Sequence, residues 1–253
     1  MKYLLLSLFL PVLIQTQTPH LNAHAHNDYE HVRPLFNALD NGFTSVEADV
    51  HLIDGQLLVS HNKPGKESRS LDQLYFYPLD SLVARNGRIF QNYDQPFYLM
   101  IDLKTDAKTT YEAVNLLLGR YSRLRCQDKF CPVRIFVSGN RPLDKIGSSE
   151  TKGLAFDGRP EDLGKGYSTD DMPVISDHYK NWSNWSGHQK STPHDLQRIR
   201  DLAHRVHAEG KKLRLWAIPD NELAWEELLG AGVDIINTDK LKELNEFLSK
   251  KGL

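Results

Sequence analysis

The sequence lacks an excess of charge of either sign. Its 31 lysine and arginine residues nearly balance its 33 aspartate and glutamate residues, which leaves a formal net charge of -2. Nucleic acids and anionic membrane surfaces are usually bound through a strongly basic face, and this balance does not predict one. We therefore expect no nucleic-acid partner, and recognition of a phosphate would depend on a few local residues.

Cysteine is scarce as well. The only two cysteines of the sequence, Cys126 and Cys131, enclose four residues in "CQDKFC". Two cysteines alone do not form a zinc site, which needs four ligands when it is structural. The spacing suits a disulfide in an exported protein and equally suits a loop with two free thiols, so both alternatives stay open.

A hydrophobic run long enough to span a bilayer is also missing. The longest run, "YLLLSLFLPVLI" after Lys2, is shorter than the ~20 residues that a membrane-spanning helix needs. A charged start followed by a short apolar stretch is typical of a secretory signal. We predict a signal peptide over residues 1–18, with a retained anchor as the alternative, and one domain over residues 19–253. The expected protein is a secreted or periplasmic monomer that touches lipid surfaces without stable membrane insertion.

What the sequence does contain is a regular alternation of short apolar runs with longer segments of helical period. This alternation is typical of repeated βα units and a parallel sheet. The runs cover residues 21–25, 45–52, 97–104, 133–139, 153–158, 173–178, 213–218 and 233–239. Eight such units predict an α/β fold of the TIM (β/α)8 barrel type, and an open doubly wound sheet is the main alternative.

The clearest helix is expected between the sixth and seventh runs. Thr192 can cap its start, Pro193 suits the first helical position, and Gly210 can end it. Further helices are expected after the third, seventh and eighth runs.

Acidic residues gather at the ends of two of these runs. Glu47 and Asp49 have the period-two spacing that sends both side chains to one side of a strand, and Asp102 ends the next run. The C-terminal strand ends carry the active site of a TIM barrel, and oxygen ligands of this kind suit Mg²⁺ or Ca²⁺. Glu47 and Asp49 as ordinary polar residues at a strand end remain an alternative.

Two histidines are expected to reach the same place. His26 ends the first run, and an Asp-Gly turn after Leu52 predicts a short return strand that brings back His61. Two histidines beside a metal ion can act as general acid and general base on a phosphodiester. Lys104, two residues beyond Asp102, could place a positive charge near the phosphate.

The segments "AHND", "GFTSVEADVHLIDGQLLVSHN", "LMIDLKT" and "LRLWAIPDNELAWEELLGAGVDIINTD" resemble the glycerophosphodiester phosphodiesterases and the wider phosphatidylinositol-phospholipase-C-like phosphodiesterase superfamily. The resemblance implies a TIM barrel that cleaves phosphodiesters with two histidines and one divalent cation. By position, His26 and His61 would be catalytic. Glu47, Asp49 and Asp102 would bind the metal, and Lys104, Trp216 and Asn237 would contact the substrate.

Two departures from that pattern concern the substrate. His26-Asn27-Asp28 replaces the family's His-Arg-Gly, and Asp102 stands where glycerophosphodiesterases have Glu. We therefore expect a small phosphodiester or phospholipid substrate, either a glycerophosphodiester or a (lyso)phospholipid. Arg141 and Arg159 are candidates to replace the missing arginine.

Two other functions stay open. His24 and His26 form the His-x-His pair that also begins the metal sites of amidohydrolases, although the fifth run lacks the histidine that such a site needs. The other alternative is an inactive barrel that binds a phosphorylated ligand.

Overall fold

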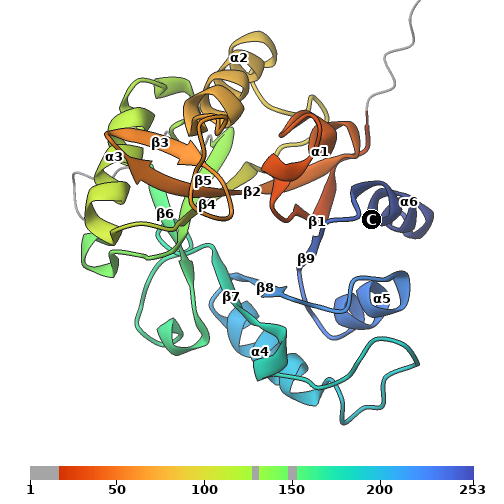
Figure 1. Ribbon diagram of the computed structural model, residues 1–253. Helices are drawn as coiled ribbons and strands as arrows, with labels where there is room; N and C mark the ends of the chain where they lie inside the picture. The colour runs from red at the N-terminus through yellow and green to blue at the C-terminus, as the bar shows by residue number, and fades with distance from the viewer. Residues whose placement is uncertain (1–16, 127–130, 148–152) are drawn as a thin grey trace, which may run out of the picture.

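The apolar runs of the sequence form the parallel strands of a closed barrel (Figure 1). The structure, a computed structural model, describes residues 17–126, 131–147 and 153–253. The parallel strands are β1 (His20–Ala25), β2 (Phe43–Ile53), β4 (Phe97–Leu103), β5 (Val133–Gly139), β6 (Leu154–Gly158), β7 (Val174–His178), β8 (Lys212–Trp216) and β9 (Ile235–Thr238). Their order is β1-β9-β8-β7-β6-β5-β4-β2, and pairing of β1 with β2 closes the ring. The predicted TIM barrel is confirmed.

A ninth strand, β3 (Gln56–Val59), runs antiparallel to the far end of β2. The turn between them consists of Asp54 and Gly55, which have φ angles of 48° and 76°. Two consecutive positive φ angles are what the tight turn of a two-residue hairpin requires, and Asp-Gly is a preferred pair there. The predicted return strand is therefore present, and it leads the chain back toward the barrel mouth.

Helices cover the outside of the barrel, but unevenly. They are α1 (Phe36–Asp40), α2 (Tyr77–Asn86), α3 (Ala107–Gly119), α4 (Gln197–Ala208), α5 (Glu222–Gly230) and α6 (Leu241–Lys251). A π-helical turn, η2 (Asp72–Phe76), leads into α2. After β5 and β6, the described residues contain only the short 3₁₀ turns η4 (Leu143–Lys145) and η6 (Pro160–Asp162) before the next strand. The helices expected after the third, seventh and eighth runs are confirmed as α3, α5 and α6.

The predicted start of the helix before β8 is wrong. The helix α4 begins at Gln197 rather than beside Pro193, although it ends near Gly210 as expected. The backbone N–H and the hydroxyl of Thr192 donate to Asp195 Oδ2 at 2.7 and 2.8 Å. These bonds close a separate turn, because a side-chain acceptor next to the chain competes with the helical pattern.

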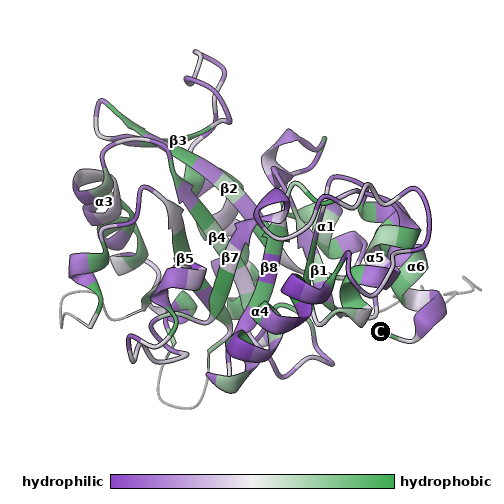
Figure 2. Ribbon diagram, turned by 90° about the horizontal axis from the view of Figure 1, so that it is seen from below, coloured by the Kyte–Doolittle hydropathy of each residue, from purple (hydrophilic) through white to green (hydrophobic). Residues whose placement is uncertain are grey.

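The barrel interior has two different layers. At the bottom, Met100, Phe136, Ala155, Val174 and Ile235 form a small apolar plug. The polar layer above it consists of buried side chains, namely His24, Glu47, Ser138, Asp157, Ser176, Arg214 and Asn237. Most TIM barrels fill their interior with branched apolar residues, so this layer is unusual. Figure 2 shows the hydropathy of each residue along the ribbon: the strands are largely hydrophobic, and α4 carries hydrophilic residues.

Cys126 and Cys131 form a disulfide, which decides between the two alternatives that the sequence left open. No helix among the described residues is long and apolar enough to cross a membrane. The apolar N-terminal stretch that predicted a signal peptide falls within residues 1–16, which lie outside the described residues.

Candidate active site

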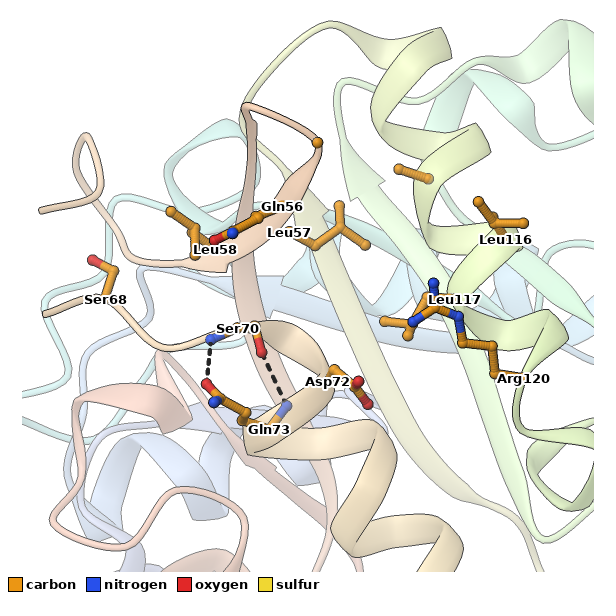
Figure 3. A pocket seen from close by; sticks show the side chains of 12 residues that line it. Gln56, Leu57, Leu58, Ser68, Ser70, Asp72, Gln73, Leu116, Leu117 and Arg120 are labelled. Atoms are coloured by element: carbon orange, nitrogen blue, oxygen red, sulfur yellow. Dashed lines mark hydrogen bonds between the residues drawn. The ribbon is translucent and has the colours of Figure 1, made fainter. Parts of the chain in front are cut away.

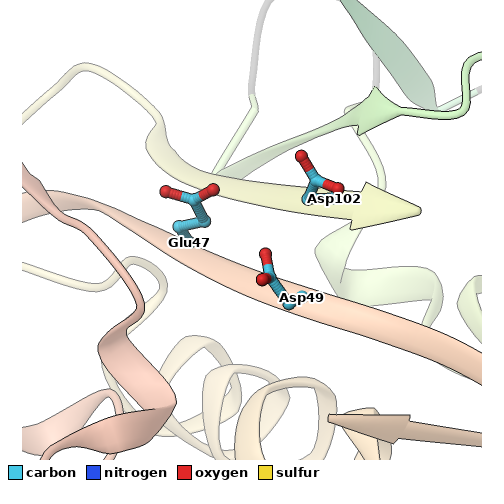
Figure 4. A group of neighbouring side chains, drawn as sticks. All are labelled: Glu47, Asp49 and Asp102. Carbon is cyan, nitrogen blue, oxygen red and sulfur yellow. The ribbon is translucent and has the colours of Figure 1, made fainter. Parts of the chain in front are cut away.

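Three carboxylates meet at the C-terminal mouth of the barrel. Asp49 on β2 lies opposite Asp102 on β4, and Glu47 lies one layer deeper, opposite Met100. One oxygen from each of the three carboxylates lies within 4.8 Å of the other two (Figure 4). Gly139 on β5 makes room for this arrangement, since a Cβ atom there would lie 2.3 Å from Asp102 Oδ1. The period-two prediction for Glu47 and Asp49 is confirmed in position.

The oxygens of Asp49 have unequal environments. Its Oδ2 lies 3.0 Å from Lys104 Nζ and 2.9 Å from His61 Nδ1. Its Oδ1 is buried and accepts no hydrogen bond from the described residues. The Tyr29 hydroxyl donates a hydrogen bond to Asn27 Oδ1 at 2.8 Å, and burial and the nearby Asp49 charge raise the pKa of Tyr29. A buried oxygen without a partner costs about 1–3 kcal/mol, more when charged, and a bound cation would remove this cost.

Lys104 lies between two of these carboxylates. Its ammonium group is 3.0 Å from Asp49 Oδ2 and 3.0 Å from Asp102 Oδ1. Burial lowers the pKa of Lys104, but the charges of Asp102 and Asp49 outweigh that effect and raise it. Burial raises the pKa of Asp102, and the charges of Asp49 and Glu47 add to the effect while Lys104 opposes it. The predicted contact of Lys104 with phosphate stays a prediction, because its partners here are the carboxylates.

Glu47 is held by a residue that the sequence analysis missed. Arg214 on β8 is 3% exposed, and its Nη2 donates to Glu47 Oε2 at 3.0 Å and to Asn237 Oδ1 at 2.5 Å. One signal was available in the sequence. Arg214 precedes Trp216 by two positions, so the alternation that sends Trp216 to the barrel mouth also sends Arg214 inward.

The two predicted catalytic histidines are held by different carboxylates. His26 directly follows β1, and its Nδ1 lies 2.8 Å from Asp239 Oδ1. His61 follows β3, and its Nδ1 lies 2.9 Å from Asp49 Oδ2. The Nε2 atom of each ring makes no hydrogen bond within the described part of the chain. Each ring therefore has one nitrogen fixed by a carboxylate and the other available, which is the arrangement that acid–base catalysis needs.

The pKa of His26 is raised by its surroundings. Burial lowers it, but the hydrogen bond with Asp239 and the negative charges of Glu47 and Asp239 outweigh that effect. The same hydrogen bond lowers the pKa of Asp239. His26 therefore carries its proton to a higher pH than an ordinary histidine does.

The predicted substrate contacts are divided by the structure. The Trp216 ring lies at the mouth, with the Arg159 guanidinium 5.0 Å from its centre and His178 edge-on to it. Asn237 is only 6% exposed and accepts from Arg214, so it lies beneath the mouth rather than on its surface. The substrate roles of both residues stay predictions.

Both arginines that could replace the missing family arginine are paired. Arg159 Nη1 donates to Asp157 Oδ2 at 2.7 Å. Arg141 donates to the Asp157 carbonyl and lies 3.3 Å from Asp162 Oδ2. A phosphate would therefore have to compete with a carboxylate for either guanidinium.

The amidohydrolase alternative loses support. His24 is fully buried, with Nδ1 2.6 Å from Ser45 Oγ and Nε2 3.4 Å from Glu47 Oε2, and burial lowers its pKa well below the usual value. Among residues 17–126, 131–147 and 153–253, Glu47, Asp49 and Asp102 form the one group of three acidic, histidine or cysteine side chains close enough to share an ion. A second metal-binding group with His24 is not present there.

A separate pocket of about 400 Å³ lies between β3, the start of η2 and α3 (Figure 3). Leu57, Leu116 and Leu117 give it an apolar side. Ser70 and Gln73 form its polar side through two reciprocal bonds of 3.2 Å. The site residues predicted from the sequence do not line this pocket, so the carboxylate cluster and its histidines remain the candidate active site.

Comparisons with known proteins point to one family. The model described as "AIM6-like phosphodiesterase domain" matches residues 14–157, and the one described as "Glycerophosphoryl diester phosphodiesterase family" matches residues 212–242. Altered inheritance of mitochondria protein 6 of Eremothecium gossypii is 27% identical over 266 residues, covering 88% of this chain and 68% of that protein. The Altered inheritance of mitochondria protein 6 homolog of Arthroderma benhamiae is 26% identical over 258 residues, covering 85% of the present chain and 80% of the fungal protein.

A solved structure shares the fold. The glycerophosphodiester phosphodiesterase of Parabacteroides distasonis superimposes with a TM-score of 0.58 and 18% identity, over 93% of this chain and 100% of that chain. At this identity the similarity shows the TIM barrel and does not show the substrate.

The predicted secreted or periplasmic location is wrong. The fungal relatives bear names that connect them with the inheritance of mitochondria, and such a link contradicts export. The prediction depended on a short apolar stretch after a single lysine. Composition of this kind gives hydrophobicity and length, and it does not specify a compartment.

Proposed function

The chain belongs to the AIM6-like phosphodiesterase domain family, and from that membership we propose that it is a metal-dependent phosphoric diester hydrolase. The observation that carries the proposal is the mouth of the barrel. Three carboxylates there offer oxygens within 4.8 Å of one another, and one buried oxygen, Asp49 Oδ1, accepts no hydrogen bond from the described residues. Like charges this close are costly unless a cation lies between them.

Glu47, Asp49 and Asp102 would hold one divalent cation, Mg²⁺ or Ca²⁺. Such an ion stabilises negative charge on a phosphoryl oxygen when it is bound. Lys104, already 3.0 Å from two of the carboxylates, lines an open polar hollow with Thr105, Gly139 and Arg141. It would place a second positive charge beside the phosphate.

His26 and His61 would divide the proton transfers. The raised pKa of His26 keeps its ring protonated further toward neutral pH, which suits the general acid that protonates the leaving oxygen. His61, oriented by Asp49, would take the proton from the attacking hydroxyl or water. Asp239 and Asp49 fix which ring nitrogen faces the substrate.

The substrate we propose is a glycerophosphodiester or the headgroup of a (lyso)phospholipid. The replacement of the family's arginine by Asn27 removes one positive charge from the mouth, and Arg159, which lies beside the Trp216 ring, is a guanidinium that could compensate for it. The choice between these substrates is left to experiment.

The test is hydrolysis of a panel of glycerophosphodiesters, lysophospholipids and inositol phospholipids, with Mg²⁺, with Ca²⁺ and with a chelator. We expect turnover of at least one substrate, loss with chelator, and loss in His26→Ala and Glu47→Gln. Matched controls are His204→Ala on α4 and Glu243→Gln on α6, both exposed on helices outside the barrel. Equal inactivity of the wild type and all variants would refute the proposal.

A second candidate, a non-catalytic barrel that binds a phosphorylated ligand, is favoured by Lys104. Its ammonium group already lies between Asp49 and Asp102, where it could replace a metal ion as the neutralising cation. Calorimetric titration distinguishes the two functions, because only the hydrolase requires the wild type to bind a divalent ion.

A further inference from the structure

Arg214 is the most deeply buried charged partner of the carboxylate cluster. It enters the polar layer from β8, three strands around the ring from β2, and is 3% exposed. Its single Nη2 group joins two side chains, Glu47 Oε2 at 3.0 Å and Asn237 Oδ1 at 2.5 Å. A buried guanidinium is stable only if such partners compensate its desolvation.

Arg214 withdraws one oxygen of Glu47 from the mouth. Glu47 Oε2 contacts both Arg214 and His24 Nε2, the latter at 3.4 Å. The other oxygen, Oε1, has no hydrogen-bond partner in the described part of the chain. Because the Arg214 Nη2 bond occupies Oε2, Oε1 is the oxygen of Glu47 that remains available to a cation.

The two other carboxylates of the cluster are restricted in the same way. Asp49 uses Oδ2 for Lys104 and His61 and keeps Oδ1 free. Asp102 uses Oδ1 for Lys104. The protein thus offers one unpartnered oxygen from each of the three carboxylates. Mg²⁺ keeps several of its own waters and needs few protein oxygens, whereas Ca²⁺ takes six to eight and often binds both oxygens of a carboxylate.

We propose that Arg214 is a positioning residue that limits Glu47 to one metal-binding oxygen and thereby favours Mg²⁺ over Ca²⁺. The inference rests on the proposed metal-dependent function. Arg214 acts through Glu47 and Asn237 and touches neither the substrate nor the reacting atoms.

The test measures the dissociation constants of Mg²⁺ and Ca²⁺ by isothermal titration calorimetry on the wild type, Arg214→Met and Arg214→Lys. Loss of a group that orients a metal ligand typically weakens binding about 10- to 100-fold. In Arg214→Met we expect Mg²⁺ to weaken by about this factor while Ca²⁺ weakens less, because a released Glu47 can present both oxygens. The preference for Mg²⁺ should fall by about tenfold. Arg214→Lys, which keeps the charge without the planar fork, should fall between the two.

The matched control is Arg123→Met. Arg123 also pairs with a buried carboxylate, that of Asp80 at 2.7 Å, and it belongs neither to the metal cluster nor to the proposed substrate contacts. Its removal should leave the ratio of the two dissociation constants unchanged. Circular dichroism checks that each variant is folded, and Arg214→Lys serves if Arg214→Met does not fold.

The outcomes separate this inference from the proposed function. If the wild type binds neither ion, the metal-dependent function fails and this role of Arg214 fails with it. If the wild type binds Mg²⁺ but both Arg214 variants keep its ion preference, the hydrolase proposal stands and Arg214 is a structural partner only.

Discussion

Glu47 and Asp157 are two buried carboxylates of the same barrel layer, and each is paired with one arginine. Asp157 on β6 accepts three side-chain bonds, from Ser176 at 2.5 Å to Oδ1 and from Ser138 and Arg159 at 2.8 and 2.7 Å to Oδ2. Glu47 on β2 uses only Oε2, which contacts Arg214 and His24. Burial and charge are therefore alike in the two residues, while the use of their oxygens differs.

The difference separates a structural carboxylate from a candidate ligand. Both oxygens of Asp157 accept hydrogen bonds, and these bonds compensate the cost of burying its charge. Glu47 leaves Oε1 without a hydrogen bond from the described residues, beside the carboxylates of Asp49 and Asp102, and this arrangement provides a place for a cation. An unpartnered oxygen beside two further carboxylates, rather than burial, marks the candidate active site.

The largest effect is expected from Glu47→Gln, which removes the negative charge of the candidate metal ligand. Loss of one preorganised charged group of an active site typically lowers kcat by about 10²- to 10³-fold, and we expect a reduction of at least this size. Stability in the absence of metal should also fall, by about 3 kcal/mol, because the buried Arg214 guanidinium loses its charged partner, and relief of the repulsion among the three carboxylates offsets part of this loss. Rates on the most active substrate of the panel and a denaturant titration test both expectations. A variant that keeps wild-type rates would remove Glu47 from the mechanism.

Asp157→Asn removes the negative charge of the structural carboxylate. The substitution leaves the Arg159 guanidinium, which is partly buried, without its charged partner, and we expect unfolding free energy to fall by about 3 kcal/mol. Metal affinity should stay the same, because Asp157 contacts no member of the cluster. Urea denaturation measures the first quantity and calorimetry the second. A change of metal affinity with unaltered stability would mean that the assignments of Glu47 and Asp157 are reversed.

Much of this contrast could be predicted from the sequence, but not its decisive part. The eight apolar runs predicted the barrel because each strand is buried on both sides and therefore continuous in hydrophobicity. Period-two spacing placed Glu47 and Asp49 on the inner side. The partner atoms could not be predicted, since Arg214 reaches Glu47 across 167 positions of sequence and only the closed barrel brings them together.

The start of α4 illustrates the opposite limit, a local competition between two signals. Thr192 and Pro193 form a favourable helix start by residue type, yet Asp195 takes both donors of Thr192 and closes a turn first. A helix that begins at Pro193 and a turn closed by Asp195 are both compatible with these residue types. The choice between them depends on packing, which the sequence pattern does not contain.

Asp28 is a third buried carboxylate, and it differs from Glu47 and Asp157 because no lysine, arginine or histidine of the described residues forms an ion pair with it. Its Oδ2 accepts from Leu35 N at 2.5 Å and from the Tyr75 hydroxyl at 2.9 Å, while Oδ1 is buried without a partner. Burial raises the pKa of Asp28 to about 6, and the two hydrogen bonds only partly oppose it. Without a paired cation, burial decides its protonation.

The sign of the resulting pH dependence follows from this shift. The folded protein keeps the Asp28 proton to about pH 6, whereas an unfolded chain loses it near pH 4. The stabilisation is therefore fully present below about pH 4 and is lost as the pH rises through about 6. Between pH 4 and pH 7, the wild type should therefore lose about 2 kcal/mol more unfolding free energy than Asp28→Asn does. Denaturation at both pH values measures this difference, and the exposed Asp144→Asn is the control.

The smallest effect is expected at Asp239, an exposed carboxylate whose partner is His26. Asp239→Asn keeps an acceptor for His26 Nδ1 but removes the negative charge, so the raised pKa of His26 should fall toward its ordinary value. If His26 is the general acid, the basic limb of the rate profile moves to lower pH by the same amount. NMR titration of the His26 ring measures the shift without reference to activity. An unchanged titration would assign the raised pKa of His26 to the Glu47 charge. Glu47, the candidate metal ligand, would then also determine the pH at which His26 loses its proton.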